Sequence, residues 1–436
     1  MKKLAGWGQF PKIETKEVIP NSEEELLTII KKNESFIARG NGRSYGDSSI
    51  NATLTINMTR MNKFLDWDQE NGELIAESGV LIADIIEHFL PKGWFPYVTP
   101  GTKYVTLGGA IACNVHGKNH HSEGAFGDYV NWIELVNDSN EVIRCSKDQN
   151  SDLFFWSIGG MGLTGIILRC SIKLKQVQTG WIMQKIQVNN NLEETMKSFL
   201  DFQDETYSVA WLDCMAKGKS FGRSILISGE HAKKDQLKLG EVIYPKRKRN
   251  KFSLFFDMPS FVLNNFSVST FNKFYFFINK KRRSSLINWD EYFYPLDWIK
   301  NWNKMYGKRG FFQLQCVLPN EVSSTGYKEI IQLIQQNSSG SFLAVIKKFG
   351  EGNGSLSFPR EGFTLALDFK ASSKNLKAAK QITELVIRLK GTIYLAKDAL
   401  LNSEEFRLLT SQNLIDSFKE FKNTKLQSEQ SKRIGL

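Results

Sequence analysis

The chain has 436 residues, of which 41% are hydrophobic and 24% charged, a composition typical of a soluble globular protein of two or three domains. The N-terminus lacks an apolar leader and no run of about 18 apolar residues follows, so we expect neither a signal peptide nor a transmembrane helix. The five cysteines are scattered and lack CxxC spacing, which argues against a disulfide framework or zinc site and favours reduced thiols in the cytoplasm.

The net charge of +11 is concentrated between Lys246 and Arg283, where ten basic residues and the single acid Asp257 give 10 − 1 = +9. Ten aromatic residues share this basic aromatic insertion, residues 246–283. Basic and aromatic side chains together favour the surface of an anionic membrane. Nucleic acid is a less favoured partner. A solvated loop with partly buried aromatic residues is the third interpretation.

In chain order, the pattern predicts a helix over 18–32 with acidic residues in its first turn, and a second helix over 81–90 that ends at Gly93. Short strands are predicted at 35–38, 54–57, 64–66 and 74–77. A second section, from 181 to about 391, contains alternating strands, the basic aromatic insertion and a helix over 374–389. The tail, 392–436, is polar and partly helical. These elements predict an α+β protein.

A glycine-rich turn, ARGNGRSYGD, follows the strand predicted at 35–38. Consecutive backbone N–H groups in such a turn form an anion-binding concavity that suits a pyrophosphate. A nicotinamide-binding Rossmann fold needs G-x-G-x-x-G at the start of a helix. Here the spacing is G-x-G-x-x-x-G and strand-like residues follow, so that fold is not expected. A plain turn is the alternative interpretation.

Two further glycine blocks, TLGGAIA from Thr106 and GGMGLTGII from Gly159, would let a large flat ligand approach the backbone. Tight packing of strands around small residues is the alternative. The segment HGKNHHS lies between these blocks. Its histidines would face one another only on a helix, and its Gly117 and Asn119 predict a loop, so we expect no metal site.

These blocks resemble the FAD domain of the vanillyl-alcohol-oxidase (PCMH-type) superfamily. The stretches RGNGRSYGD, VTLGGAIACNVHGKNHHS and GGMGLTGII, together with FYPLDWIKNWNKMYGKRGFFQLQ, FLAVIKKFG, LSFP, LDF and YLAKD, are most similar to the decaprenylphosphoryl-β-D-ribose 2′-oxidase branch. The resemblance covers nearly the whole chain and thins over the basic aromatic insertion. It implies a two-part FAD-binding domain (1–180, with 392–436 returning to it) and a mixed-sheet substrate domain (181–391).

The resemblance also implies roles for individual residues. Cofactor contacts would come from Ala38, Arg39, Gly40, Asn41, Gly42, Arg43, Ser44, Tyr45, Gly46, Asp47, Ser48, Gly101, Thr106, Leu107, Gly108, Gly109, His116, Gly117, Lys118, Asn119, Ile167 and Tyr394. Substrate contacts would come from Tyr45, Lys118, Phe293, Gln313, Gln315, Lys347, Thr364, Ala366 and Lys397. The implied catalytic residues are Lys397, His116 and Lys347, with Lys397 supplying a cation beside the flavin.

Three positions depart from the family pattern. Arg43 stands where covalent relatives carry the histidine that bonds the flavin, so we expect non-covalent FAD. Ala366 replaces a pocket cysteine found in some members, with Thr364 nearby. Phe293 takes the place of a pocket tyrosine. The pocket wall therefore differs from that of the family.

The activity implied by the resemblance is oxidation of a sugar hydroxyl by hydride transfer to flavin N5, on a polyprenyl-phosphoryl pentose. This would be the first half of a 2′-epimerisation that a short-chain NAD(P)H reductase completes. The alternatives are a soluble sugar-alcohol or aldonolactone oxidase, which would not need the basic aromatic insertion, and a membrane-binding or nucleic-acid-binding protein that keeps the fold without FAD chemistry. We expect a cytoplasmic enzyme bound peripherally to the inner face of the plasma membrane.

Overall fold

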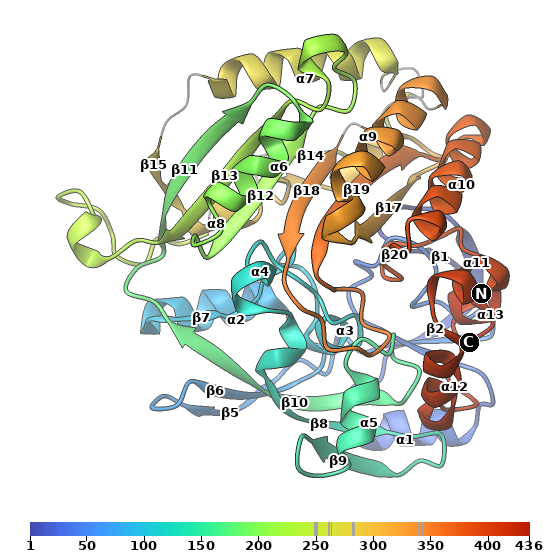
Figure 1. Cartoon of the computed structure of the whole chain (residues 1–436). Coiled ribbons are helices and arrows are strands. Elements are labelled where there is room, and N and C mark those ends of the chain that lie inside the picture. The colour runs from blue at the N-terminus through green and yellow to red at the C-terminus, as the bar shows by residue number, and fades with distance from the viewer. Residues whose placement is uncertain (248–251, 260–261, 263, 281–283, 338–340, 342) are drawn as a thin grey trace.

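The computed structural model describes residues 1–247, 252–259, 262, 264–280, 284–337, 341 and 343–436. Its helices and strands form an α+β fold in which two smaller sheets lie below one large sheet (Figure 1). Six basic residues of the basic aromatic insertion lie outside the described residues: Lys248, Arg249, Lys251, Lys281, Arg282 and Arg283.

The first small sheet has the strand order β1 (Lys2–Ala5), β2 (Lys12–Val18), β4 (Leu54–Asn57) and β3 (Ile37–Arg39). Helix α1 (Glu23–Lys31) packs against it through Leu26 and Ile30, which are fully buried. The hydroxyl of Ser22 accepts a hydrogen bond from the Glu25 amide and caps this helix. The helix is therefore shorter than the 18–32 predicted, because the chain is extended up to its cap.

The second small sheet has the order β5 (Phe64–Asp68), β6 (Glu73–Glu77), β10 (Ile166–Gln176), β8 (Val130–Val136) and β9 (Val142–Ser146), and β7 (Trp94–Pro96) also pairs with β10. Four helices accompany it: α2 (Ile82–Phe89), α3 (Leu107–Ala112), α4 (His120–Glu123) and α5 (Ser151–Ser157). The predicted helix over 81–90 corresponds to α2, and Gly93 ends the following turn with a left-handed φ of 85°. No strand or helix directly follows the glycine-rich turn, since the next strand is β4.

The large sheet has eight strands in the order β15 (Ser285–Asn288), β11 (Trp181–Asn189), β13 (Ser224–His231), β12 (Tyr207–Leu212), β18 (Ala344–Phe349), β19 (Gly362–Lys370), β17 (Phe311–Leu318) and β20 (Thr392–Ile393). Helices α6 (Leu192–Asp201), α9 (Asn320–Asn337) and α10 (Ser373–Arg388) cover one face (Figure 1). The other face looks toward the small sheets, with α8 (Trp289–Phe293) beside it. Helix α7 (Asn265–Lys280) lies near the β11–β13–β12 end, and β14 (Phe252–Ser253) pairs with β16 (Ile299–Lys300).

The C-terminal tail begins in the large sheet as β20 and then returns to the first small sheet through α11 (Ser403–Leu409), α12 (Gln412–Phe421) and α13 (Glu429–Ile434). The backbone of Phe36 exchanges hydrogen bonds with Lys425 and Gln427, so both ends of the chain share one part of the fold. Figure 1 places the N- and C-termini on the same side of the molecule. The three glycine blocks lie opposite the inner face of the large sheet, and we call the boundary between them the internal seam.

Candidate active site

A cavity of about 1450 Å³ lies along this seam, between the glycine blocks and the inner face of the large sheet. Sites for a single small molecule are usually about 300–1000 Å³. The extra volume leaves room for a dinucleotide cofactor and a substrate together.

The glycine-rich turn forms one wall of the cavity. Gly42 has a left-handed φ of 62°, and a Cβ on Gly40 would lie 2.2 Å from Oγ1 of Thr106. Only glycine fits both positions, because one has a backbone conformation that disfavours side chains and the other has no space for one. Nη2 of Arg39 donates a hydrogen bond to the carbonyl of Ala5 at 2.7 Å and so connects the turn to β1. The guanidinium of Arg43 lies over the ring of Trp7, 4.4 Å from the ring centroid.

The cavity wall has features that the protein alone does not explain. Gly101 lines the cavity, and a Cβ there would meet no protein atom within 4 Å, so its bare backbone leaves space for a ligand. Nδ1 of His116 and Oγ of Ser78 are buried in this wall with no hydrogen-bond partner in the described part of the protein. Buried polar groups are almost always paired. The glycine turn, the bare backbone and these two polar atoms fit a bound FAD.

Apart from the exposed Lys300, three half-buried lysines line the cavity: Lys118, Lys347 and Lys397. Burial in the cavity wall lowers the pKa of Lys118 and of Lys347 to about 7, and each is lowered further by a neighbouring lysine. No carboxylate lies within 4.0 Å of these three ammonium groups among the described residues. Cations gathered in this way create a strong preference for an anion.

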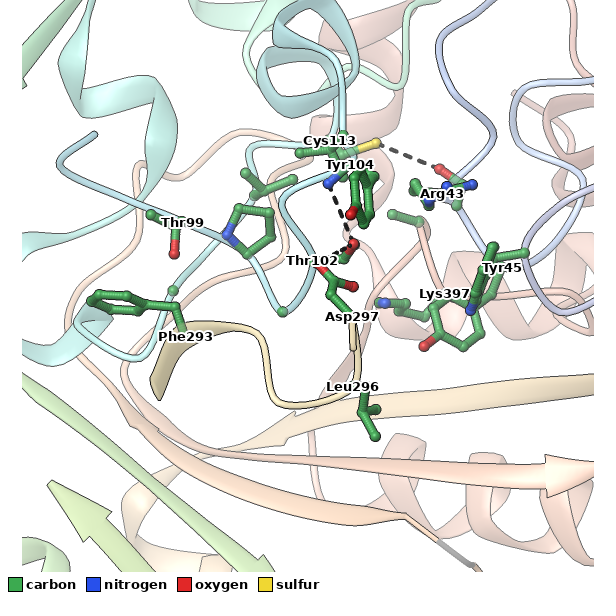
Figure 2. Close-up of a pocket in the computed structure, with 18 of the residues that line it drawn as sticks. Arg43, Tyr45, Thr99, Thr102, Tyr104, Cys113, Phe293, Leu296, Asp297 and Lys397 are labelled. Atoms are coloured by element: carbon green, nitrogen blue, oxygen red, sulfur yellow. Dashed lines mark hydrogen bonds between the residues drawn. The ribbon is translucent and has the colours of Figure 1, made fainter. Parts of the chain in front are cut away.

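Lys397 belongs to a small network beside the cavity. Its Nζ lies 3.8 Å from the centroid of the Tyr45 ring, and Figure 2 shows the two side chains together at one edge of the pocket. The buried carboxylate of Asp368 accepts hydrogen bonds from Gln313 and, at 3.3 Å, from Tyr306. Burial raises the pKa of Asp368. Burial lowers the pKa of Lys397, and the negative charge of Asp368 offsets part of that lowering. The network therefore holds one cation at a defined place.

A second charged cluster joins the glycine blocks to the substrate side of the cavity. Asp297 accepts a hydrogen bond from the Thr102 hydroxyl at 3.1 Å (Figure 2). It accepts a second one from the Lys103 amide at 3.0 Å. The ammonium group of Lys103, which is 2% exposed, donates to Asp290. Burial raises the pKa of Asp297. This cluster fixes the segment after α8 against the loop that precedes α3.

Most of the residues predicted from the sequence line the cavity. They are Ala38, Arg39, Gly40, Asn41, Gly42, Arg43, Ser44, Tyr45, Ser48, Gly101, Thr106, Gly108, Gly109, His116, Gly117, Lys118, Ile167, Phe293, Gln313, Gln315, Lys347, Ala366, Tyr394 and Lys397. The remaining predicted residues lie behind this wall: Gly46, Asp47, Leu107, Asn119 and Thr364. Two of these hold the lining from outside, since Asp47 forms an ion pair with Arg433 and Thr364 contacts the amide of Gln315.

The rings of His116 and His120 both pack against Phe349, whereas His120 and His121 have different hydrogen-bond partners. Nδ1 of His120 accepts a hydrogen bond from the Gly350 amide, and Nε2 of His121 lies 2.9 Å from the Glu205 carbonyl. The pKa of His120 is lowered to about 3, mainly by burial and next by the positive charge of Lys347. No group of three or more His, Cys, Asp or Glu side chains is arranged to hold a metal among the residues that the structure describes.

The sequence did not assign roles to several lining residues. Asp297 lies within the quoted stretch FYPLDWIK, and Tyr104 and Cys113 flank the TLGGAIA block, so proximity to a motif was the available signal. Val345 lies within the quoted stretch FLAVIKKFG, whereas Trp211 carried no such signal, because its place in the cavity depends on strand pairing.

Comparison with known proteins also indicates FAD, the cofactor that the cavity wall fits. Residues 16–146 match the model of an FAD-binding domain family, described as "FAD binding domain". Cytokinin dehydrogenase 3 of Arabidopsis thaliana is 29% identical over 36% of this chain and 32% of its own. L-gulonolactone oxidase of Mus musculus is 26% identical over 40% of each chain. These relatives match well under half of the chain.

One relative matches nearly the whole chain. The decaprenylphosphoryl-β-D-ribose oxidase of Mycolicibacterium smegmatis (strain ATCC 700084 / mc(2)155) is 33% identical over 428 residues, covering 94% of this chain and 91% of its own. The similarity therefore includes the large sheet as well as the cofactor-binding part. The chain is an FAD-dependent oxidoreductase and belongs to the decaprenylphosphoryl-β-D-ribose oxidase family.

Proposed function

We propose that this enzyme oxidises a hydroxyl group of a polyprenyl-phosphoryl pentose to a ketone, as the first half of a 2′-epimerisation. A relative that covers 94% of the chain, and so both parts of the fold, is named for the oxidation of decaprenylphosphoryl-β-D-ribose. Cytokinin dehydrogenase 3 and L-gulonolactone oxidase, which are named for other molecules, cover only 36% and 40% of the chain. The proposal therefore depends on similarity in the large sheet, which supplies Gln313, Gln315 and Lys347.

The observation that carries the proposal is the group of three lysines without a carboxylate partner. A neutral sugar alcohol or a lactone offers these cations no opposite charge. A phosphoryl sugar does, and Lys and Arg side chains bind phosphate strongly when water is excluded. The charges of Lys118 and Lys397 thus favour a phosphorylated substrate over a free sugar, whereas Lys347 is the lysine assigned to proton transfer.

Bound FAD supplies the acceptor for the hydrogen that leaves the carbinol carbon as hydride. The side chains of this chain would do the rest. Lys397 keeps a positive charge at the cavity edge, where negative charge that develops during the reaction is stabilised. Lys347, with a pKa of about 7, can accept the hydroxyl proton at Nζ. Gln313 and Gln315 present amide groups that orient the sugar.

The test is anaerobic bleaching of the flavin absorbance in the purified holoenzyme. Farnesyl-phosphoryl-β-D-ribose should reduce the flavin, and farnesyl β-D-riboside, which has the same chain but no phosphate, should reduce it far more slowly. Equal rates with both compounds, or no reduction by the phosphoryl riboside, would reject the proposal.

The ketone has to be reduced again to complete an epimerisation. We propose that a separate short-chain NAD(P)H-dependent reductase adds hydride to the opposite face of the sugar. Supporting this, hydride returned by the reduced flavin would reach the same face of the sugar and restore the starting configuration, whereas a separate nicotinamide enzyme can deliver hydride to the opposite face.

We also propose that the enzyme works at the surface of an anionic membrane, on the cytoplasmic side. Three phenylalanines of α7 are strongly exposed: Phe266, Phe274 and Phe277. Lys273 and Lys280 on the same helix are exposed as well. Exposed aromatic groups beside cations suit the lipid interface. No helix among the described residues is both long and apolar enough to cross a bilayer.

A further inference from the structure

One face of the large sheet changes from polar to apolar along its length. Strand pairing places Gln315, Ala366, Val345 and Trp211 side by side in one row across β17, β19, β18 and β12. All four line the cavity. The row begins at the amide beside His116 and ends at an indole, so the polarity of the cavity falls with distance from the cofactor side.

The apolar end continues across the next strands. Val209 on β12 pairs with Ile227 on β13, which pairs with Ile186 on β11. Each is half-buried and lines the same cavity, and Ile287 of β15 lies beyond them. Adjacent aliphatic side chains on a sheet form a continuous apolar floor. The register of β12 with β18 places Val209 beside Lys347, and the cavity extends from there across β13 and β11 as an apolar arm.

Helix α7 covers this arm. Phe271, Tyr275 and Asn279 follow the four-residue spacing of one helix face, and all three line the cavity. The Tyr275 ring lies 4.8 Å from that of Trp211, and Asn272 donates to Asp213 at 2.8 Å. These contacts fix α7 above the sheet, so that the arm has a floor and a roof.

The arm opens to the surface beside two aromatic residues. Phe271 is 40% exposed and Trp298 is 47% exposed, although both line the cavity. Phe252, on the neighbouring strand, lies 5.9 Å from Trp298, centroid to centroid. The opening thus adjoins the exposed aromatic side chains of α7 that we propose to contact lipid.

We propose that this arm, between α7 and the β11–β13–β12 surface, binds the first isoprene units of the substrate's lipid chain. This inference rests on the proposed function, because it assigns a place to the chain of the same substrate. The chain enters past Phe271 and Trp298, lies along Val209 and Ile227, and delivers the phosphoryl sugar to the lysines. The remaining isoprene units stay in the membrane.

Burial of hydrocarbon contributes about 0.8 kcal/mol per CH₂ group, so binding should improve with chain length until the arm is full. The first experiment compares methyl-, geranyl- and farnesyl-phosphoryl-β-D-ribose as reductants of the flavin. The KM should fall at least about tenfold for each isoprene unit added within this series, with little change in kcat. A KM that does not change with chain length would overturn the assignment.

A substitution then places the effect in the arm. Ile186→Trp fills part of the floor on β11 and should raise the KM of the farnesyl compound at least about tenfold more than that of the methyl compound. Ile19→Trp makes the same exchange after β2, where the side chain is 36% exposed and does not line the cavity, and should leave both KM values unchanged. Equal effects of Ile186→Trp on the two compounds would contradict the proposal.

A binding measurement separates this inference from the proposed function. Farnesyl phosphate with a terminal diazirine, irradiated with the wild-type holoenzyme, should label peptides from 207–212, 224–231 or 265–280. Labelling confined to other parts of the protein would show that the arm does not bind lipid, even if ribosides reduce the flavin. Labelling of these peptides with no reduction by any phosphoryl riboside would support lipid binding in the arm and reject the proposed oxidation.

Discussion

The side-chain amide nitrogen of Gln315 lies 2.9 Å from Nε2 of His116, and this contact determines which nitrogen of the imidazole carries the proton. The same amide nitrogen lies 3.1 Å from Oγ1 of Thr364, whose hydroxyl donates to the Cys316 carbonyl at 2.9 Å. The Thr364 oxygen is therefore an acceptor, and the amide donates in both directions. Nε2 of His116 must accept, and Nδ1 carries the hydrogen.

Burial, and next the charge of Lys347, hold the pKa of His116 well below its usual range, so the ring is neutral with one free N–H donor. Thr364→Val should release the Gln315 amide and shift part of the His116 population to the other tautomer. We expect about a fivefold fall in kcat with little change in KM, from the loss of one hydrogen bond of about 1 kcal/mol. Thr364→Ser should restore the activity. ¹⁵N spectra of labelled histidine report the tautomer directly, and an unchanged tautomer in Thr364→Val would contradict this relay.

The flavin should be held without a covalent bond. Arg43 replaces the linking histidine, and burial raises the pKa of the nearby Cys113 thiol to about 11, which keeps it protonated and unreactive. Acid precipitation should therefore release yellow flavin into the supernatant. Flavin that stays with the pellet, and a mass increase of the chain by one FAD, would show a covalent bond.

Lys397→Ala should keep FAD but reduce the flavin about 10²–10³-fold more slowly, since one preorganised charge is lost. Rapid-mixing spectroscopy under anaerobic conditions measures this step. The control is Lys374→Ala, which removes an exposed lysine from α10 and should have no effect. Reduction of the Lys397→Ala holoenzyme at the wild-type rate would exclude Lys397.

The acidic limb of the pH profile should report Lys347. Its pKa is lowered to about 7 by burial and then by Lys397, so Lys347 is protonated below that pH and becomes a base above it. kcat/KM should rise with pH through about 7 and then level off. Lys347→Met should lose this limb, and Lys348→Ala, on the same strand but outside the cavity lining, should keep it. A limb that survives in Lys347→Met and disappears in Lys118→Met would assign the base to Lys118.

Binding to vesicles should depend on both charge and aromatic residues. Replacing Lys246, Arg247, Lys248 and Arg249 by serine should weaken co-sedimentation with anionic vesicles, and raising the salt to 1 M should do the same, since the Debye length falls to about 3 Å. Phe274→Ser with Phe277→Ser should also weaken it. Leu408→Ser removes an equally exposed apolar side chain from α11 and should not. Equal sedimentation on neutral and anionic vesicles, or tight DNA binding at about 0.2 M salt, would reject membrane attachment by charge.

The cofactor side of the site was predictable because glycine turns carry their signal within a few residues. Gly40 and Gly42 are required by local geometry, and the sequence alone identified them. The substrate side was less predictable. Trp211 and Val345 are 134 positions apart and become neighbours only through the pairing of β12 with β18. The role of Asp297 depends likewise on the distant Thr102. Helix α7 was not predicted, because the basic and aromatic composition of 246–283 indicated a surface insertion rather than a helix.

Arg433 binds Asp47 at 2.7 Å and Asp398 at 3.1 Å, and so joins the end of the glycine-rich turn to the segment that carries Lys397. Asp47 is buried, and without Arg433 its charge would have no ion-pair partner among the described residues. Because one guanidinium bridges both carboxylates, any movement of α13 away from this position would loosen the glycine-rich turn and the Lys397 segment together.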